Sequence, residues 1–199
     1  MTKLVQGIGF NEKDYTRLNN GKQLKEYALW NSMLLRCTQK YWDKKPTYTG
    51  TTCSENFKSY SYFYRWCQEQ VGFDNIDENG KSWHLDKDIL VNGNKLYSED
   101  TCVFVPARIN TLLTKRDASR GEFPIGVGLY KRTNKYRSAA TIGKCVQKHL
   151  GYYETPDEAF MAYKTYKERF IKEVADEHKE QLDPRAYQAL MNYEVNIDD

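Results

Sequence analysis

The stretch that decides the fold is residues 83–110, which read WHLDKDILVNGNKLYSEDTCVFVPARIN. A short strand with one histidine and two acids comes first. The turn signal Asn92-Gly93-Asn94 then leads back toward a second strand at Thr101–Val105, which is rich in β-branched residues. Pro106 suits the first turn of a helix that runs to about Arg116. The pattern predicts two strands closed by a helix, a compact clamp for one divalent cation.

The first strand, expected over Trp83–Leu90, carries three side chains that can do chemistry: His84, Asp86 and Asp88. Because residues two apart on a strand point to one face, Asp86 and Asp88 are expected to share a side. A histidine can take a proton from water, and carboxylates bind hard cations. The plainer alternative is a structural or surface histidine, with acids that hydrogen-bond within the loop or pair with Lys87 or Lys95.

This layout resembles the ββα-metal fold of the HNH (His-Me finger) nucleases, in a form common in phage proteins. The resemblance implies that His84 is the general base. It also implies that Asp86 and the helix residue Asn110 hold a metal, Mg²⁺ or Mn²⁺. Asp88, on the same strand face as Asp86, could replace the ligand that Trp83 cannot supply. A plainer role for Asn110 is bonding the nearby turn. The family usually has His or Asp before the base, where this chain has Trp83, and the Asn that braces the family's loop has no clear equivalent.

Two helices are expected ahead of this unit, because apolar residues recur there at helical spacing. They span Lys22–Trp42 and Ser59–Val71, with a short strand at Tyr48–Cys53 between them and a loosely ordered arm at residues 1–20. The second helix carries an aromatic stripe made of Tyr60, Phe63, Tyr64, Trp66 and Cys67. Core packing explains such a stripe, and base stacking on exposed rings is the alternative.

Positive charge gathers between Gly126 and Tyr153, a window without Asp or Glu in a chain whose net charge is only +3. A basic element free of acids is expected of a phosphate-binding face. A solvated basic face without a partner is the alternative. The residues predicted to contact DNA are Lys131, Arg132, Lys135, Tyr136, Arg137, Lys144 and Lys148.

The same region predicts three strands and a long helix. The strands are expected at Ile125–Lys131, Tyr136–Ile142 and Val146–Tyr153. Thr155-Pro156-Asp157-Glu158 is a strong helix start, since the threonine can cap the helix and the glutamate can close a capping box. That helix is expected to run to about His178, and a last short helix follows over Arg185–Tyr193.

About 45 residues of this region resemble the APETALA/ethylene-response-factor DNA-binding domain, above all the stretch LGYYETPDEAFMAY at residues 150–163. The resemblance implies a three-stranded sheet that enters the major groove of double-stranded DNA and is braced by one amphipathic helix. Asp157 stands where the family has the first Glu of a pair. The family's sheet tryptophans are replaced by Tyr130, Tyr136 and His149, which leaves base preference open.

Composition excludes several classes of protein. No apolar run approaches the roughly 18 residues of a membrane span, and the N-terminus has neither the apolar region nor the cleavage site of a signal peptide. The five cysteines are widely spaced, without Cys-x-x-Cys, which predicts reduced, mostly buried thiols rather than a zinc knuckle or a disulfide framework. The expected location is the cytoplasm, that of the host if a phage encodes the chain, and no membrane partner is expected.

These observations predict an α+β protein of two domains, with a charged, glycine-containing linker at Asp117–Glu122. Residues 1–117 would hold the helical lead-in and the ββα nuclease-like unit, and residues 118–199 a three-stranded antiparallel sheet packed on one long helix. The predicted function is that of a homing-type, metal-dependent DNA endonuclease. A DNA-binding regulator or counter-defence protein that no longer cuts is the alternative, which Trp83 favours. A protein-interaction module that uses the aromatic helices is a third possibility.

Overall fold

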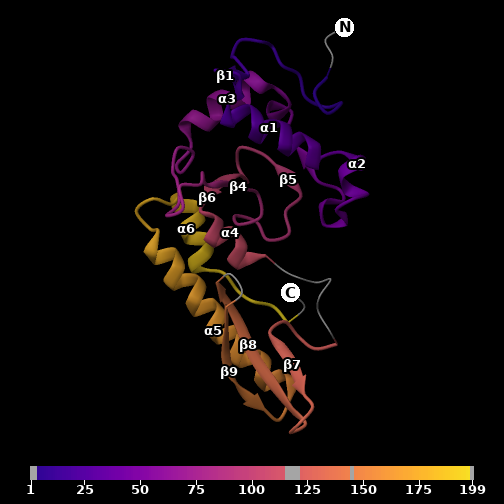
Figure 1. Ribbon diagram of the computed structural model, residues 1–199, viewed down its shortest axis with the longest axis vertical. Helices are drawn as coiled ribbons and strands as arrows, with labels where there is room; N and C mark the ends of the chain where they lie inside the picture. Colours follow the sequence, from indigo (N-terminus) through magenta and orange to yellow (C-terminus); the bar gives the residue numbers. More distant parts are fainter. Residues whose placement is uncertain (1–3, 115–121, 144–145, 198–199) are drawn as a thin grey trace. The chain divides into compact units, whose positions relative to one another are not determined.

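The computed structural model describes residues 4–114, 122–143 and 146–197 (Figure 1). Its contacts divide the chain into two compact units, Met1–Val105 and Pro106–Asp199. The mixed α and β class expected from the sequence is confirmed. The expected linker lies outside the described residues, except for Glu122. None of the described helices combines the length and the apolar character that a membrane crossing requires.

The first unit combines helices with short strand pairs. Its helical segments are α1 (Lys25–Arg36), α2 (Gln39–Trp42), α3 (Tyr60–Glu69) and the 3₁₀ turns η1 (Pro46–Tyr48) and η2 (Asn56–Lys58). Its antiparallel pairs are β1 (Leu18–Asn19) with β2 (Lys22–Gln23) and β4 (His84–Asp86) with β6 (Val103–Val105). Its parallel pair is β3 (Thr52–Cys53) with β5 (Leu96–Tyr97).

Local capping explains why the first predicted helix is interrupted. The helix expected over Lys22–Trp42 stops at Arg36, and Thr38 starts α2 by accepting the Tyr41 N–H at 3.3 Å. A threonine hydroxyl satisfies one of the free N–H groups at a helix start, so it favours a new helix over a continuous one. The strand expected at Tyr48–Cys53 is also shorter than predicted: η1 ends at Tyr48, and β3 begins only at Thr52.

The N-terminal segment is packed on α1 and α3. The prediction of a loosely ordered arm at residues 1–20 is therefore wrong for residues 4–20, the part that the structure describes. Glu12 accepts hydrogen bonds from the Ser59 hydroxyl and from the Ser61 N–H at the start of α3. An acid in this place complements the free N–H groups and positive end of a helix. Tyr15 stacks on Tyr64 with ring centroids 4.1 Å apart.

The aromatic stripe of α3 is core, as the packing interpretation predicts. Tyr60, Phe63 and Trp66 are buried. The Phe63 ring meets Phe57 edge-on, with ring centroids 5.1 Å apart, and packs at a tilt against Trp66. The Trp30 indole N–H donates to the Phe57 carbonyl at 2.8 Å, which satisfies the polar atom of a fully buried ring. These buried rings cannot stack on bases, so that alternative was wrong for them.

The second unit contains the predicted three-stranded antiparallel sheet. Its elements are α4 (Ala107–Leu113), β7 (Val127–Tyr130), β8 (Lys135–Gly143), β9 (Val146–Tyr153), α5 (Pro156–Glu177) and α6 (Pro184–Met191). The strand order is β7-β8-β9, and α5 packs along the sheet (Figure 1). The capping box between Thr155 and Glu158 is present, as predicted. The helix that the sequence assigns to the first domain is α4, which packs on α5 and β8.

A small apolar core joins the sheet to α5. Ala140 on β8 meets Phe160 and Tyr163 on α5, and Val195 closes the cluster. Gly126 lies directly against the Tyr163 ring with φ +78°, and a Cβ there would come within 2.1 Å of a ring carbon. Only glycine combines this backbone conformation with so close an approach.

Candidate functional site

The strand pair β4–β6 presents two of the predicted nuclease residues. His84 lies opposite Val105, and Asp86 lies opposite Val103. Leu85 between them points into the core, so His84 and Asp86, two residues apart, share the other face of the strand. His84 is exposed and Asp86 is half-buried. A histidine and a carboxylate are therefore side by side on one strand.

Asp86 ends the strand. Its Oδ1 atom accepts the N–H groups of Asp88 at 2.7 Å and of Ile89 at 2.9 Å, which turns the chain. The prediction that the strand reaches Leu90 is therefore wrong, since β4 ends at Asp86. Asp88 lies in the turn and does not share a strand face with Asp86. These bonds are the loop contacts that the plainer interpretation of the acids predicts.

The surroundings of Asp86 disfavour its negative charge. Burial raises the pKa of the Asp86 carboxyl and the nearby charge of Asp88 adds to this, while the two backbone N–H groups and Lys87 oppose it. Both hydrogen bonds that Asp86 accepts from described residues go to Oδ1. Oδ2 is therefore the atom of this half-buried carboxyl to which a cation would bind.

Lys87 neutralises part of the loop. Its side chain is buried, its ammonium group pairs with Asp88 and donates to the Asn94 carbonyl at 2.5 Å, and it lies 5.7 Å from the ring centroid of Tyr97. We call the segment Asp86–Leu96 the acid loop. The formal charges of Asp86, Lys87 and Asp88 sum to −1, because the buried lysine offsets only one of the two carboxylates.

Asn94 braces the acid loop, a role that sequence reasoning did not assign. Its amide group donates to the carbonyls of Lys87 and Leu96, both at 2.7 Å, and its Oδ1 atom accepts the Leu96 N–H at 3.0 Å. Asparagine is a residue type that bonds local backbone in turns, so the Asn-Gly-Asn signal carried this information. Asn94 thus holds both sides of the turn.

Asn110 and Trp83 lie in different units. Asn110 lies on α4, after the buried Ile109, and belongs to the second unit, whereas the acid loop belongs to the first. Its role as a metal ligand stays a prediction. Trp83 is buried, and its backbone N–H donates to the Asn75 carbonyl at 3.1 Å, so it anchors the start of β4 in the core. Within the described ranges no three or more His, Cys, Asp or Glu residues form a group that could hold a metal.

The sheet of the second unit has one side that α5 does not cover. Ser138 and Ala140 on β8 are buried on the α5 side. Because successive side chains on a strand alternate, Lys135 and Arg137 point to the other side. Arg137 lies opposite Tyr152, and Lys135 lies opposite Tyr130, and directly opposed residues share a face.

Aromatic rings form a line on this side. Tyr130 and Tyr152 have ring centroids 4.9 Å apart, and His149 follows 4.7 Å from Tyr152. The guanidinium of Arg132 lies 5.6 Å from the Tyr130 centroid. We call this surface the open face; it consists of Tyr130, Arg132, Lys135, Arg137, His149 and Tyr152. Sequence reasoning did not assign a role to Tyr152, although its alternation with the inward Tyr153 was a signal for it.

Three other residues predicted to contact DNA lie outside the open face. Lys131 is exposed in the turn after β7, and Lys144 lies outside the described residues. Tyr136 is on the α5 side, where its ring meets Phe123 edge-on at 5.3 Å. Lys148 lies opposite Ala140, so it also shares the α5 side. The pleat therefore divides the predicted set between the two sides of the sheet.

The open face keeps its positive charge. Lys135 pairs with the exposed Glu154 at 2.6 Å, and Arg137 donates to the Gln147 side chain at 3.3 Å. A solvent-exposed ion pair is worth only about 0–1 kcal/mol, so a phosphate can displace Glu154 at little cost. The arginine contact is to a neutral amide. Both cations are thus held in place without being neutralised by a buried partner.

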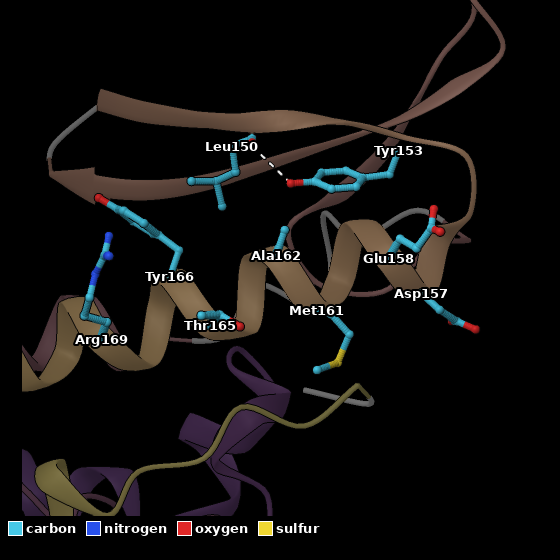
Figure 2. A pocket seen from close by; sticks show the side chains of 9 residues that line it. All are labelled: Leu150, Tyr153, Asp157, Glu158, Met161, Ala162, Thr165, Tyr166 and Arg169. Atoms are coloured by element: carbon cyan, nitrogen blue, oxygen red, sulfur yellow. Dashed lines mark hydrogen bonds between the residues drawn. The ribbon is translucent and has the colours of Figure 1, made fainter.

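An open groove of about 830 Å³ lies on the α5 side of the sheet, between α5 and β9 (Figure 2). Leu150, Met161 and Tyr166 give it apolar walls, and the Tyr153 hydroxyl inside it donates to the Leu150 carbonyl at 3.1 Å. Because the groove and the open face are on opposite sides, a ligand on one leaves the other accessible.

Comparisons with known proteins supply no relative: no protein-family model matches the chain, and neither a curated protein nor a solved structure matches it. Function is therefore inferred from the chemistry of two features. They are the acid loop with its neighbour His84 in the first unit, and the open face in the second.

Proposed function

We propose that this chain binds double-stranded DNA through the open face and hydrolyses phosphodiester bonds with a divalent metal held at the acid loop. The observation that carries the proposal is the open face itself. Three rings in a line, flanked by Arg132 and Arg137, occupy the side of a sheet that its own helix leaves uncovered.

The chemistry of the open face fits nucleic acid. Arginine donates paired hydrogen bonds to phosphates and to the O6 and N7 atoms of guanine, and aromatic rings pack on sugars and bases. The major groove, about 12 Å wide, admits a helix or a narrow strand ribbon. The window Gly126–Tyr153 has no acid to repel a phosphate backbone. Phosphate contacts would set affinity, and Arg137, on the central strand β8, would reach a phosphate or a base edge.

The acid loop supports the hydrolytic part of the proposal. His84, exposed on β4, would take a proton from the attacking water. Asp86 Oδ2 and the Asp88 carboxylate would hold Mg²⁺ or Mn²⁺, since these cations prefer oxygen ligands and retain several waters. A half-buried carboxyl whose pKa is raised gains stability from a nearby cation, so the site suits such a group. When bound, the metal would stabilise negative charge on the phosphate. The role of Asn110 as a ligand stays a prediction from the sequence.

A DNA-binding protein that does not cut is the second candidate. The observation that favours it is the use of both acids within the loop itself. Asp86 Oδ1 holds the turn, and Asp88 is paired with the buried Lys87. In that case the acid loop is a structural element, and only the open face carries function.

Nicking of a supercoiled plasmid separates the two candidates. The endonuclease proposal predicts relaxed circles with Mg²⁺ or Mn²⁺, none with a chelator, and none for Asp86→Asn. The matched control is Asp77→Asn, because Asp77 Oδ1 holds an equivalent turn by accepting the N–H groups of Asn79 and Lys81, both at 2.9 Å. That variant should nick as the wild type does. Intact plasmid with every metal, at protein concentrations that bind DNA, would leave the non-cutting protein as the function.

A further inference from the structure

Two cysteines of the first unit lie side by side although they are 16 residues apart in sequence. Cys37 caps the end of α1, and Cys53 lies on β3. Cys53 lies opposite Tyr97 on β5, and Tyr97 accepts a hydrogen bond from Arg36, the residue before Cys37. The Cys37 thiol donates to the Met33 carbonyl at 3.3 Å and interacts with the neighbouring Cys53 thiol. Both are half-buried, whereas Cys67 and Cys102 are fully buried.

The cations around this pair favour a thiolate at Cys53 rather than at Cys37. Arg36 and Lys87 act to lower the pKa of Cys37, which is nevertheless raised, and Lys58 acts to lower that of Cys53 against the opposing charge of Glu55. The interaction with Cys37 lowers the pKa of Cys53, while the interaction with Cys53 and burial raise the pKa of Cys37. Reactive cysteines lie in partly exposed, electropositive surroundings of this kind.

The buried cysteines offer an internal contrast. Burial raises the pKa of Cys102 to about 12 and raises that of Cys67 further, so neither forms a thiolate near neutral pH. Their low solvent access also excludes a reagent of the size of a peptide disulfide. The structure thus separates two thiols that can react from two that cannot.

We propose that Cys37 and Cys53 form a reversible disulfide by exchange with a low-molecular-weight disulfide such as oxidised glutathione. The Cys53 thiolate attacks one sulfur of glutathione disulfide, which forms a mixed disulfide and releases one glutathione thiolate. Cys37 then loses its proton and attacks the Cys53 sulfur, which releases the second glutathione. Two protein thiols are oxidised by two electrons, and one glutathione disulfide is reduced to two thiols.

The place of the pair connects it to the acid loop. β3 pairs with β5, and Tyr97 on β5 accepts a hydrogen bond from Arg36 at 3.1 Å while its ring lies beside Lys87. A bond between Cys37 and Cys53 would tie the end of α1 to this layer. Closing a loop of about 16 residues should shift the ratio of folded to unfolded first unit on the order of a hundredfold toward the folded state.

The test uses the full chain with Cys145→Ser, which removes a thiol that lies outside the described residues. After incubation with oxidised glutathione, thiols are counted with a maleimide of high mass, and disulfide-linked peptides are identified by mass spectrometry. We expect the loss of two thiols together, a linked Cys37–Cys53 peptide, full reversal by dithiothreitol, and a higher urea midpoint of the oxidised form.

Cys37→Ser and Cys53→Ser are the matched controls. Each should retain a single reactive thiol that stops at the mixed disulfide, and neither should gain stability on oxidation. The proposal is overturned if the wild-type pair yields only glutathione adducts, if the linked peptide contains Cys67 or Cys102, or if both thiols stay free in excess oxidant.

Discussion

Replacing Asp86 by asparagine should leave the first unit as stable as the wild type or more stable, whereas replacing it by alanine should destabilise it. Asparagine keeps an oxygen that can accept the two N–H groups that Asp86 Oδ1 accepts at 2.7 and 2.9 Å. Alanine loses both bonds, at about 0.5–1.5 kcal/mol each, so Asp86→Ala should cost about 1–3 kcal/mol. Asparagine also removes a charge that burial disfavours.

Asp77 supplies a control, because its pKa is shifted in the direction opposite to that of Asp86. It holds the same kind of turn and is also only partly exposed, but its hydrogen bonds with the Lys81 and Asn79 backbone lower its pKa. The folded state therefore favours the charge of Asp77 and disfavours that of Asp86. Asp77→Asn should destabilise the first unit at neutral pH, although it is the same chemical change in an equivalent turn.

The sign of the pH dependence follows from these two directions. The raised pKa of Asp86 means that the folded state holds its proton more tightly than the unfolded state. Its contribution to stability is thus greatest below the unfolded pKa and falls as pH rises through the folded pKa. For Asp77 the pKa is lowered, so its contribution is present above the unfolded pKa and is lost as pH falls through the folded pKa. A metal on Asp86 would offset the penalty at neutral pH.

Urea unfolding followed by tryptophan fluorescence measures this unit selectively, because all four tryptophans lie within residues 30–83. The wild type and the three variants are compared at several pH values, with and without Mg²⁺. The metal should stabilise the wild type increasingly as pH rises and should not stabilise Asp86→Asn. Equal losses for Asp86→Asn and Asp86→Ala, or equal stabilisation of Asp86→Asn and the wild type by Mg²⁺, would refute the reasoning.

Three further changes test other parts of the molecule. Asn94→Ala removes three hydrogen bonds and should destabilise the first unit by about 1.5–4.5 kcal/mol in the same urea assay; a loss below half a kcal/mol would show that Asn94 does not brace the loop. His84→Ala should abolish plasmid nicking while duplex binding is retained, and unchanged cleavage would exclude His84 as the base. Gly126→Ala should destabilise the second unit by more than about 1 kcal/mol, because a side chain at φ +78° is strained and would meet the Tyr163 ring. Protease susceptibility of the full chain measures this loss, and equal cleavage rates for the variant and the wild type would contradict it.

Sequence predicts best what local chemistry decides. The start of α5 follows from Thr155 and Glu158, which bond each other's backbone within one turn. The turn between β7 and β8 follows from Asn134, whose φ of +54° is one that asparagine tolerates. The alternation of side chains along each strand predicts that the sheet has a covered and an uncovered side. Which side Tyr136 and Lys148 occupy follows only from the observed register of the strands.

Sequence fails where distant residues decide the outcome. The N-terminal segment reads as polar and loose, yet Glu12 meets Ser59 and Ser61, which are more than 40 residues away. The apolar residues Ile89 and Leu90 favour a strand that continues past Asp86, but a side-chain bond to the backbone ends the strand there. The contact between Cys37 and Cys53 has no signal in their spacing, since it depends on how β3 returns to the end of α1.

The central claim, that the open face binds double-stranded DNA, is tested most directly by the salt dependence of duplex binding. Fluorescence anisotropy gives the slope of log K against log salt for the wild type, for Arg132→Gln with Arg137→Gln, and for Lys148→Gln as the control on the opposite side of the same sheet. If both arginines contact phosphates, the double variant should flatten the slope by about 1.8, at about 0.9 for each lost contact, while Lys148→Gln leaves it unchanged. An unchanged slope in the double variant, or an equal effect of Lys148→Gln, would contradict the claim.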